Sequence, residues 1–264
     1  MAWSKEELGE LLGELKKNYS SVELSKSLGL EGVLSERSCL SDTAILRHIR
    51  EGSVVIDPFK RENLATSSYD VTLGQYFYRE VKPGHADRRV LNPYDERHVR
   101  TIWQLHEAQT LRTEAKNANW SDAFGDNISP EDSVILISPG ETILAHTDEY
   151  IGGKIDVTTM MKARSSMGRN FIAVCKCAGW GDVGYINRWT MEITNNSQHY
   201  TIPLVVGRRI AQIVFFGVEP IQQKDYSNAG GKYQVSESLG ELKAKWTPEA
   251  MLPKMWKDRE VRGK

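Results

Sequence analysis

The segment RSSMGR, residues 164–169, places two arginines and two serines around a glycine. Guanidinium groups bind phosphate oxygens through paired hydrogen bonds, and hydroxyl and backbone N–H groups add further donors. The segment therefore predicts a phosphate-binding site made by Arg164, Ser165, Ser166 and Arg169. A polar turn that caps a short helix would have the same composition, so the motif alone leaves both interpretations open.

Glu192 lies within RWTMEITN, residues 188–195, whose composition predicts a strand. Successive side chains of a strand alternate between its faces, so Thr190, Glu192 and Thr194 share one face while large apolar residues occupy the other. If that face is half-buried, burial raises the pKa of the carboxyl group and makes Glu192 a candidate general acid or base. If the face is solvated, Glu192 is an ordinary surface residue.

Asp182 precedes Glu192 in the glycine-rich segment AGWGDVGY, residues 178–185. An aspartate beside a bound substrate can orient and deprotonate a water, but aspartates also stabilise turns through local hydrogen bonds. The spacing to Glu192 allows both carboxylates to face one ligand.

Metal-dependent and serine-nucleophile chemistry are disfavoured, because the chain has no P-C-x-x-C, H-E-x-x-H, Walker A or G-x-S-x-G motif. Cys175 and Cys177 would share one face of a strand, but no second pair exists to complete a zinc site. We expect buried, unreactive thiols and no metal held by the protein.

The composition excludes several classes of protein. The 264 residues carry a net charge of −1, without the basic excess that nucleic-acid binding needs. The mean hydropathy is −0.46, and no apolar run is long enough to span a membrane. The first residues, MAWSKEELGELLGELKK, are too charged for a signal peptide, so we expect a cytoplasmic protein.

The catalytic candidates require a scaffold of strands. Short apolar runs separated by Gly, Pro and Asn begin at Val54 and predict a β sandwich or barrel, preceded by a helix from Ser41 or Asp42 to Gly52. Helical patterns predict an extension over 1–39. An insertion over about 94–131 should contain a helix that includes Val99, Ile102, Trp103 and Leu105. The charged segment 237–264 is predicted to be a tail ordered by docking on the body.

Several motifs occur together in the order found in one enzyme family. They are YDVTLG (69–74), PGETILAHTDEYI (139–151), RSSMGR (164–169), AGWGDVGY (178–185), TMEITN (190–195), GRRIAQIVF (207–215) and Y…GGKYQ (226–234). In these motifs the chain resembles the dCTP deaminases of the dUTPase superfamily, over roughly residues 40–236. The resemblance implies a mainly β, dUTPase-like distorted jelly-roll (β-clip) with added helices. It also implies a homotrimer with sites between subunits, and a pyrimidine deoxynucleoside triphosphate as substrate, carrying Mg²⁺.

The resemblance also implies roles for individual residues. Glu192 would shuttle protons between water and the C4 amino group of cytosine, and Asp182 would lie near the deoxyribose. RSSMGR would hold the triphosphate. Four further residues would contact the base or the sugar: Tyr185, Thr190, Met191 and Gln212. Tyr226, Lys232 and Gln234 would belong to the C-terminal segment that closes over the phosphates.

Departures from the family pattern leave the products open. Gly179-Trp180 replaces the His-Arg of monofunctional deaminases, which favours the bifunctional members that convert dCTP to dUMP. Val183 and Asn187 alter the turn that presents Asp182, and Ser236 replaces the last Gln of the closing motif, for which Gln234 is a candidate substitute. The alternatives are a dUTPase-type pyrophosphatase without deamination and a nucleotide-responsive regulatory protein.

Overall fold

The computed structural model describes residues 39–82, 90–118, 120, 127–222, 225–226, 232–234, 236 and 238–261. The chain divides after Ser38, and Cys39–Lys264 form one compact unit. The helical extension was predicted over residues 1–39, and of these residues the structure describes Cys39 alone. The predicted helices therefore lie outside the described residues.

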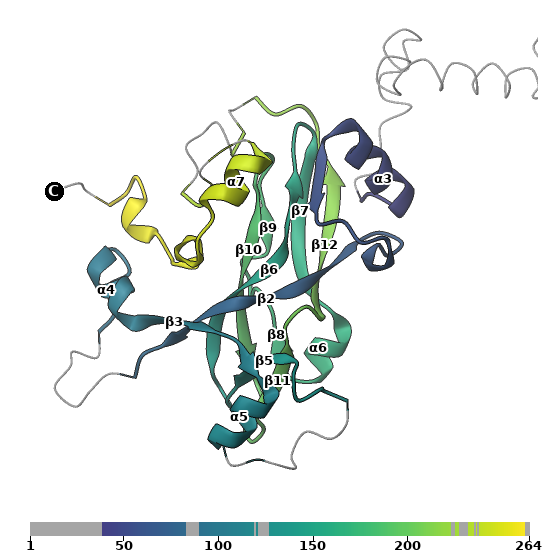
Figure 1. Ribbon diagram of the computed structural model, residues 1–264. Coiled ribbons are helices and arrows are strands. Elements are labelled where there is room, and N and C mark those ends of the chain that lie inside the picture. Colours follow the sequence, from purple (N-terminus) through teal and green to yellow (C-terminus); the bar gives the residue numbers. More distant parts are fainter. Residues whose placement is uncertain are drawn as a thin grey trace, which may run out of the picture. The chain divides into compact units, whose positions relative to one another are not determined.

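The fold is mainly β, which confirms the predicted class (Figure 1). The strands are β1 (Val54–Asp57), β2 (Tyr69–Glu80), β3 (Trp103–Glu107), β4 (Gln109–Thr110), β5 (Ser133–Ile137), β6 (Thr142–Gly153), β7 (Val157–Ala163), β8 (Ile172–Ala173), β9 (Trp180–Gly181), β10 (Ile186–Asn195), β11 (Ile202–Val205) and β12 (Arg209–Gly217). The α-helices are α3 (Asp42–Glu51), α4 (Glu96–Ile102), α5 (Leu111–Ala118), α6 (Ser165–Arg169) and α7 (Leu239–Lys245), and the 3-10 helices are η1 (Arg61–Asn63), η2 (Pro248–Met251) and η3 (Met255–Lys257).

Nine strands form one antiparallel sheet in the order β8-β10-β6-β2-β12-β7-β9, with β1 also paired to β6 and β3 to β2. A second sheet has the order β11-β5-β4. Register shifts interrupt the pairing of β2 with β6 between Leu73 and Phe77, and that of β10 with β6 between Arg188 and Thr190. These shifts bend the sheet around a core that includes the fully buried Tyr69 and Phe215.

Helix α3 forms where the sequence predicts it. The Ser41 hydroxyl accepts a hydrogen bond from the Ala44 N–H, and Gly52 closes the helix with φ of 84°. None of the helices in the described part of the chain has the length and apolar character needed to span a bilayer.

The helix predicted in the insertion is shorter than expected. Asp95 caps α4 by accepting a hydrogen bond from the Arg97 N–H, but the helix ends at Ile102. Trp103 and Leu105 instead lie on β3, where they pair with Glu80 and Tyr78 of β2. The prediction was wrong for these two residues because strand pairing with a distant segment outweighs the local helical spacing.

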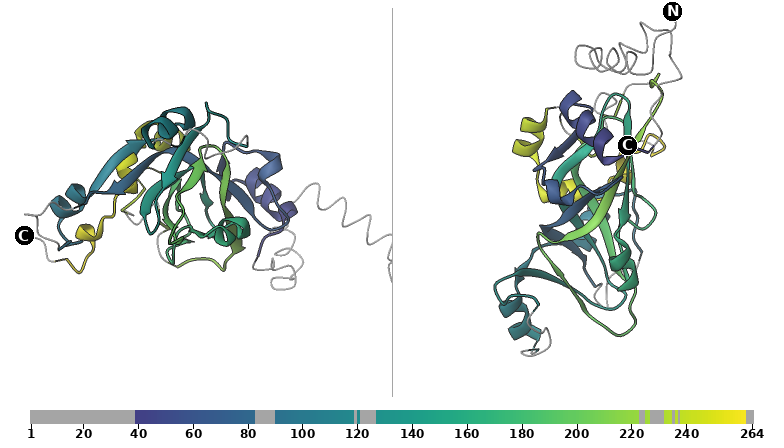
Figure 2. Two further views of the ribbon diagram at one scale, coloured as in Figure 1. Left: turned by 90° about the horizontal axis from the view of Figure 1, so that it is seen from below. Right: turned by 90° about the vertical axis from the view of Figure 1, so that its right-hand side faces the viewer.

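The C-terminal segment packs on the body of the protein. Met251 and Leu252 are buried against Tyr78 and Leu144, and Leu242 of α7 is buried against Tyr150 and Ile186. In both Figure 1 and Figure 2 the yellow C-terminal segment lies beside α4, to which an Arg100–Glu249 ion pair of 3.5 Å joins it.

Candidate active site

A cavity of about 610 Å³ lies between β10, the loop around β9 and the C-terminal segment. Six of the residues singled out in the sequence line it: Asp182, Tyr185, Thr190, Glu192, Tyr226 and Lys232. They come from three stretches of the chain, 182–185, 190–192 and 226–232. Only the first two of these stretches are close in sequence. The tertiary structure therefore brings most of the predicted base and sugar contacts together.

Glu192 lies in the wall of this cavity, on β10 opposite Leu144 of β6. Its side chain is half-buried, and burial raises the pKa of the carboxyl group above its usual value, with Lys176 opposing the shift. The buried Oε2 has no hydrogen-bond partner among the residues that the structure describes. A carboxyl group with one unoccupied oxygen and a raised pKa is equipped to exchange a proton with a bound water.

The turn that follows β8 supplies Lys176. Cys175 and Lys176 have φ values of 60° and 34°, a conformation that non-glycine residues adopt at a cost. The Cys175 N–H donates to the Glu192 carbonyl oxygen at 3.1 Å, so the strained turn is tied to the strand that bears Glu192. This arrangement brings an ammonium group to the cavity wall beside the carboxylate.

The expectation for the cysteines was partly wrong. They lie in this turn and not on a strand, so they do not share a face; Cys175 is buried and Cys177 is exposed. Burial raises the pKa of the Cys175 thiol to about 12, which makes this thiol unreactive. Within the described residues, no three His, Cys, Asp or Glu side chains are grouped so that they could hold a metal ion.

Asp182 is exposed on the turn between β9 and β10, and its carbonyl oxygen accepts from the Tyr185 N–H at 3.0 Å. The Tyr185 ring makes edge contacts with Trp189 and Tyr226, at centroid distances of 5.3 and 5.1 Å. Burial raises the pKa of the Tyr185 hydroxyl, so this residue remains a neutral aromatic wall. The turn thus presents a carboxylate at the mouth of an aromatic pocket.

The segment around Lys232 is held against the start of β10. The Gln234 Oε1 accepts from the Ile186 N–H at 2.8 Å, and the Asn187 Nδ2 donates to the Tyr233 carbonyl oxygen at 2.7 Å. Asn187 replaces the glycine of the family pattern, and its amide fixes the adjoining segment. Lys232 forms an ion pair with Asp258, which raises the pKa of the lysine.

The predicted phosphate-binding residues lie outside this cavity. Ser165, Ser166 and Arg169 are exposed on α6, which Figure 1 shows below and to the right of α7. The Arg164 Nε lies 3.3 Å from Oδ2 of the buried Asp70, which also pairs with Arg209 at 3.0 Å. The cavity that Glu192 lines has no lining residue from 164–169, and the two cavities that Met167 of α6 lines do not include Glu192.

Three other predicted contacts, Met191, Gln212 and Gln234, do not line the cavity. Met191 is fully buried in the core, so it can approach a ligand only through its backbone. Gln212 is half-buried on β12, where it pairs with Asp70 of β2 and Lys162 of β7. Gln212 therefore pairs with β7, the strand that leads directly into Arg164 and α6.

Comparison with known proteins identifies the family. The profile of the family described as "DCD: dCTP deaminase-like" matches residues 39–218. The chain belongs to the dCTP deaminase-like family. This agrees with the resemblance in the sequence motifs, because the matched range includes RSSMGR, Asp182 and Glu192.

Relatives of this chain in the family come from several organisms. The chain is 29% identical over 195 residues to "dCTP deaminase, dUMP-forming" of Methanosphaerula palustris, covering 74% of this chain and 89% of the relative. It is 32% identical over 179 residues to the protein of the same description from Methanobrevibacter smithii, covering 67% and 78%. The crystal structure of 2'-deoxycytidine 5'-triphosphate deaminase from Agrobacterium tumefaciens aligns with 17% identity and a TM-score of 0.46. The alignment covers 68% of this chain and 48% of that one, so the chain spans about half the length of this structure.

Sequence reasoning missed several residues that line the cavity. Chief among them are Trp103, Lys176, Trp180, Trp189, Met251 and Pro253. Trp180 and Trp189 stand beside the predicted residues and could have been found from that proximity. Trp103, Met251 and Pro253 come from the insertion and the C-terminal segment, and no local pattern indicates that these regions meet Glu192. Asp70 was also missed, although the YDVTLG motif contains it.

Proposed function

We propose that the chain catalyses the hydrolytic deamination of dCTP, with the cytosine bound in the cavity beside Glu192. The observation that carries the proposal is the half-buried Glu192 carboxyl group, whose pKa is raised and whose Oε2 has no hydrogen-bond partner in the described part of the chain. The printed names of the relatives support the choice of dCTP as substrate.

Deamination at C4 needs two proton transfers. As a water adds to C4, the Glu192 carboxylate takes one of its protons and passes it to N3 of the cytosine. The carboxylate then takes the proton of the new C4 hydroxyl group and passes it to the amino group, which leaves as ammonia. The C4–N bond breaks as a C4–O double bond forms, so dCTP and water give dUTP and ammonia. One carboxyl group serves both transfers, and its raised pKa brings it nearer to the operating pH.

We further propose that release of pyrophosphate is coupled to deamination and gives dUMP. A second water must attack the α-phosphorus, and the exposed Asp182 lies in the wall of the same cavity, where it can orient that water. The description "dUMP-forming" of both relatives above supports this product. The altered turn around Asp182 retains the Asp182–Tyr185 backbone hydrogen bond of 3.0 Å.

The triphosphate site is proposed to lie between subunits of a homotrimer. Arg164, Ser165, Ser166 and Arg169 do not line the Glu192 cavity of their own chain, so α6 of a neighbouring copy would supply the phosphate contacts. Closed cyclic symmetry allows each chain to complete the site of the next. Mg²⁺ would enter on the phosphate oxygens of the nucleotide, as part of the substrate. Tyr226, Lys232 and Gln234 are proposed to belong to the segment that closes the site.

The test of the chemistry is to incubate the protein with dCTP and Mg²⁺ and to measure ammonia and pyrophosphate separately. Glu192→Gln keeps the shape of the side chain but removes the proton transfer, so ammonia release should fall ~10²–10⁴-fold. Glu107→Gln, an exposed residue on β3 outside the cavity, is the matched control. Asp182→Asn should reduce pyrophosphate release far more than ammonia release.

The outcomes separate the candidate functions. Full deamination by Glu192→Gln would refute the role of Glu192. Quantitative dUTP without pyrophosphate would exclude coupling, and cleavage of dUTP without attack on dCTP would indicate a dUTPase-type pyrophosphatase. Nucleotide binding without any turnover would indicate a regulatory protein.

The test of the shared site is to mix two inactive variants, Glu192→Gln and Arg169→Ala, after dissociation and reassembly. If each site uses both chains, random mixing restores about a quarter of the wild-type sites. No recovery of activity in mixed trimers would place both groups on one chain.

A further inference from the structure

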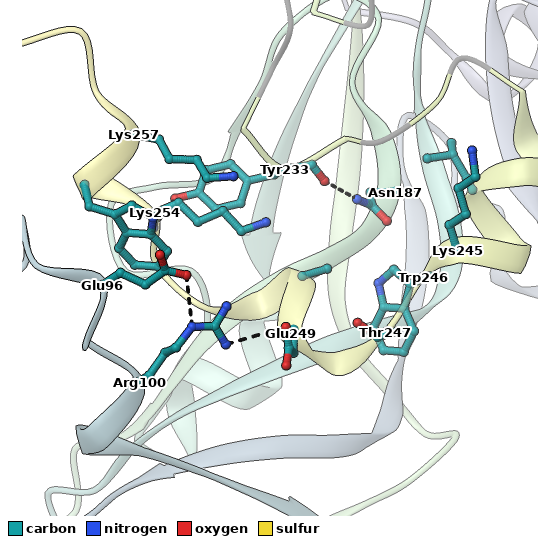
Figure 3. A pocket seen from close by; sticks show the side chains of 13 residues that line it. Glu96, Arg100, Asn187, Tyr233, Lys245, Trp246, Thr247, Glu249, Lys254 and Lys257 are labelled. Carbon is teal, nitrogen blue, oxygen red and sulfur yellow. Dashed lines mark hydrogen bonds and ion pairs between the residues drawn. The ribbon is translucent and has the colours of Figure 1, made fainter. Parts of the chain in front are cut away.

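A second cavity of about 250 Å³ lies between α4 and the C-terminal segment (Figure 3). Its walls contain four cationic side chains, Arg100, Lys245, Lys254 and Lys257, against two carboxylates, Glu96 and Glu249. The site therefore has a net positive charge. It is formed largely by residues beyond position 218, where the family match ends.

Within the described ranges, two of these cations, Lys254 and Lys257, have no carboxylate partner. Arg100 donates to Glu96 at 3.0 Å and lies 3.5 Å from Glu249, as the dashed lines in Figure 3 show. No ion pair joins Lys254 or Lys257 to a carboxylate of the described residues; the Lys254 Nζ donates only to the Lys232 carbonyl oxygen, at 3.1 Å. Burial and the charges of Lys257 and Arg100 lower the pKa of Lys254. An anion placed between these groups would relieve that repulsion.

Two residues that line this cavity, Trp246 and Trp256, carry indole N–H groups without an acceptor among the described residues. The Nε1 atoms of Trp246 and Trp256 are both buried and have no partner among the described residues. Leaving such a donor unsatisfied costs free energy, so two beside one cationic cavity call for an explanation. A ligand with several acceptor oxygens, admitted by a small movement of the indole rings, would satisfy them.

The aromatic walls and the size indicate more than a free inorganic ion. The cavity is lined by the rings of Tyr233, Trp246 and Trp256, and its volume equals that of about eight liquid waters. Phosphate occupies only part of that space, and the rings offer surfaces on which an aromatic group can stack. The positive charge and the N–H donors thus suit a phosphate group, and the aromatic surface suits an aromatic group of the same ligand.

We propose that this cavity is a second ligand site, which binds the phosphate group of a small aromatic phosphate ester. Lys254, Lys257 and Arg100 contact the phosphate, and the indoles contact the aromatic part. The proposal is independent of the reaction at Glu192. Tyr233 lines both cavities, so a ligand here stabilises the segment that forms one wall of the candidate active site.

The experiment is calorimetric titration of the full chain with phenyl phosphate, and with phenol and inorganic phosphate as comparison probes. The double variant Lys254→Met/Lys257→Met should bind phenyl phosphate at least ~10-fold more weakly. The matched control is Lys82→Met/Lys116→Met, two exposed lysines outside the cavity, which should bind as the wild type does. Inorganic phosphate should bind more weakly than phenyl phosphate, and phenol should not bind.

A further pair of variants keeps the test decisive. Lys257→Met alone changes an exposed side chain, so it should fold normally and still weaken binding. Arg164→Ala/Arg169→Ala removes the proposed phosphate contacts on α6 and should leave this binding intact. Wild-type affinity in Lys254→Met/Lys257→Met, or loss of binding only in the α6 variant, would overturn the proposal. Equal binding of phenol would also overturn it, because the cavity would then be an apolar site.

Discussion

Gly184 offers a sharp test of how the turn beside Asp182 supports the candidate active site. Its φ of 91° lies in a region that side-chain-bearing residues rarely adopt. A Cβ atom at this position would lie 2.9 Å from Cγ of Asp225 and 3.0 Å from the backbone nitrogen of Tyr226. Gly184→Ala must therefore displace the segment that carries Tyr226.

The expected loss of stability has two parts. The left-handed backbone costs an alanine about 1–2 kcal/mol. Displacement of Tyr226 also breaks the hydrogen bond from its N–H to the Val183 carbonyl oxygen, 2.8 Å in the native structure, which contributes about 0.5–1.5 kcal/mol. We expect a total of about 1.5–3.5 kcal/mol, which urea unfolding can measure.

Gly140 is the matched control. Its φ is 73°, but a Cβ atom there would have no neighbour within 4 Å. Gly140→Ala should therefore show only the backbone cost of about 1–2 kcal/mol, and its effect on the unfolded chain is the same as that of Gly184→Ala. The difference between the two variants isolates the contact with residues 225 and 226.

Enzyme assays complete the test. Because Tyr226 packs against Tyr185 in the cavity wall, Gly184→Ala should raise the KM for dCTP by about fivefold for each kcal/mol of lost binding, whereas Gly140→Ala should leave KM unchanged. Equal losses of stability and equal KM values in the two variants would refute the argument that the missing Cβ of Gly184 allows residues 225 and 226 to pack against the turn.

Three other outcomes are expected. Asp70→Asn removes the carboxylate shared by Arg164 and Arg209, so it should destabilise the protein by about 1–3 kcal/mol and raise the KM for dCTP with kcat unchanged; an unchanged KM would show that Asp70 does not position Arg164. Burial raises the pKa of Glu192, so its ionised form costs folding free energy above the ordinary pKa of 4.5; Glu192→Gln should therefore be more stable than the wild type at neutral pH, and this gain should vanish as the pH falls below 4.5. Asp258→Asn frees Lys232 from its ion pair, so nucleotide affinity should rise about two- to fivefold at low salt and less at high salt, and an unchanged affinity would mean that Lys232 does not reach the phosphates.

The features that the sequence determined are those set by local chemistry. Ser41 and Gly52 bound α3 because a hydroxyl cap and a left-handed residue act on the nearest turns alone. The alternation on β10 puts Met191 in the core and Glu192 in the cavity wall because neighbouring side chains of a strand point to opposite faces. The motifs likewise identify the family, since each is a short run of residues in a fixed order.

Long-range contacts decided what the sequence could not. Trp103 and Leu105 have helical spacing, but they lie on β3 because β2 offers backbone partners that a local pattern cannot reveal. Cys175 and Cys177 separate into a buried and an exposed thiol because the chain turns with positive φ after β8. Contacts with segments remote in sequence hold both arrangements, since the Cys175 N–H donates to the Glu192 carbonyl oxygen at 3.1 Å.

The candidate active site divides in the same way. The sequence supplied Glu192, Asp182 and the RSSMGR motif as chemical groups, but only the tertiary structure separates α6 from the Glu192 cavity. Only the folded chain brings Trp103 and Met251 to that cavity, and only it joins Asn187 to Tyr233 at 2.7 Å. Residue type determines which reactions a side chain can perform, whereas distances between segments remote in sequence are determined by how the whole sheet packs.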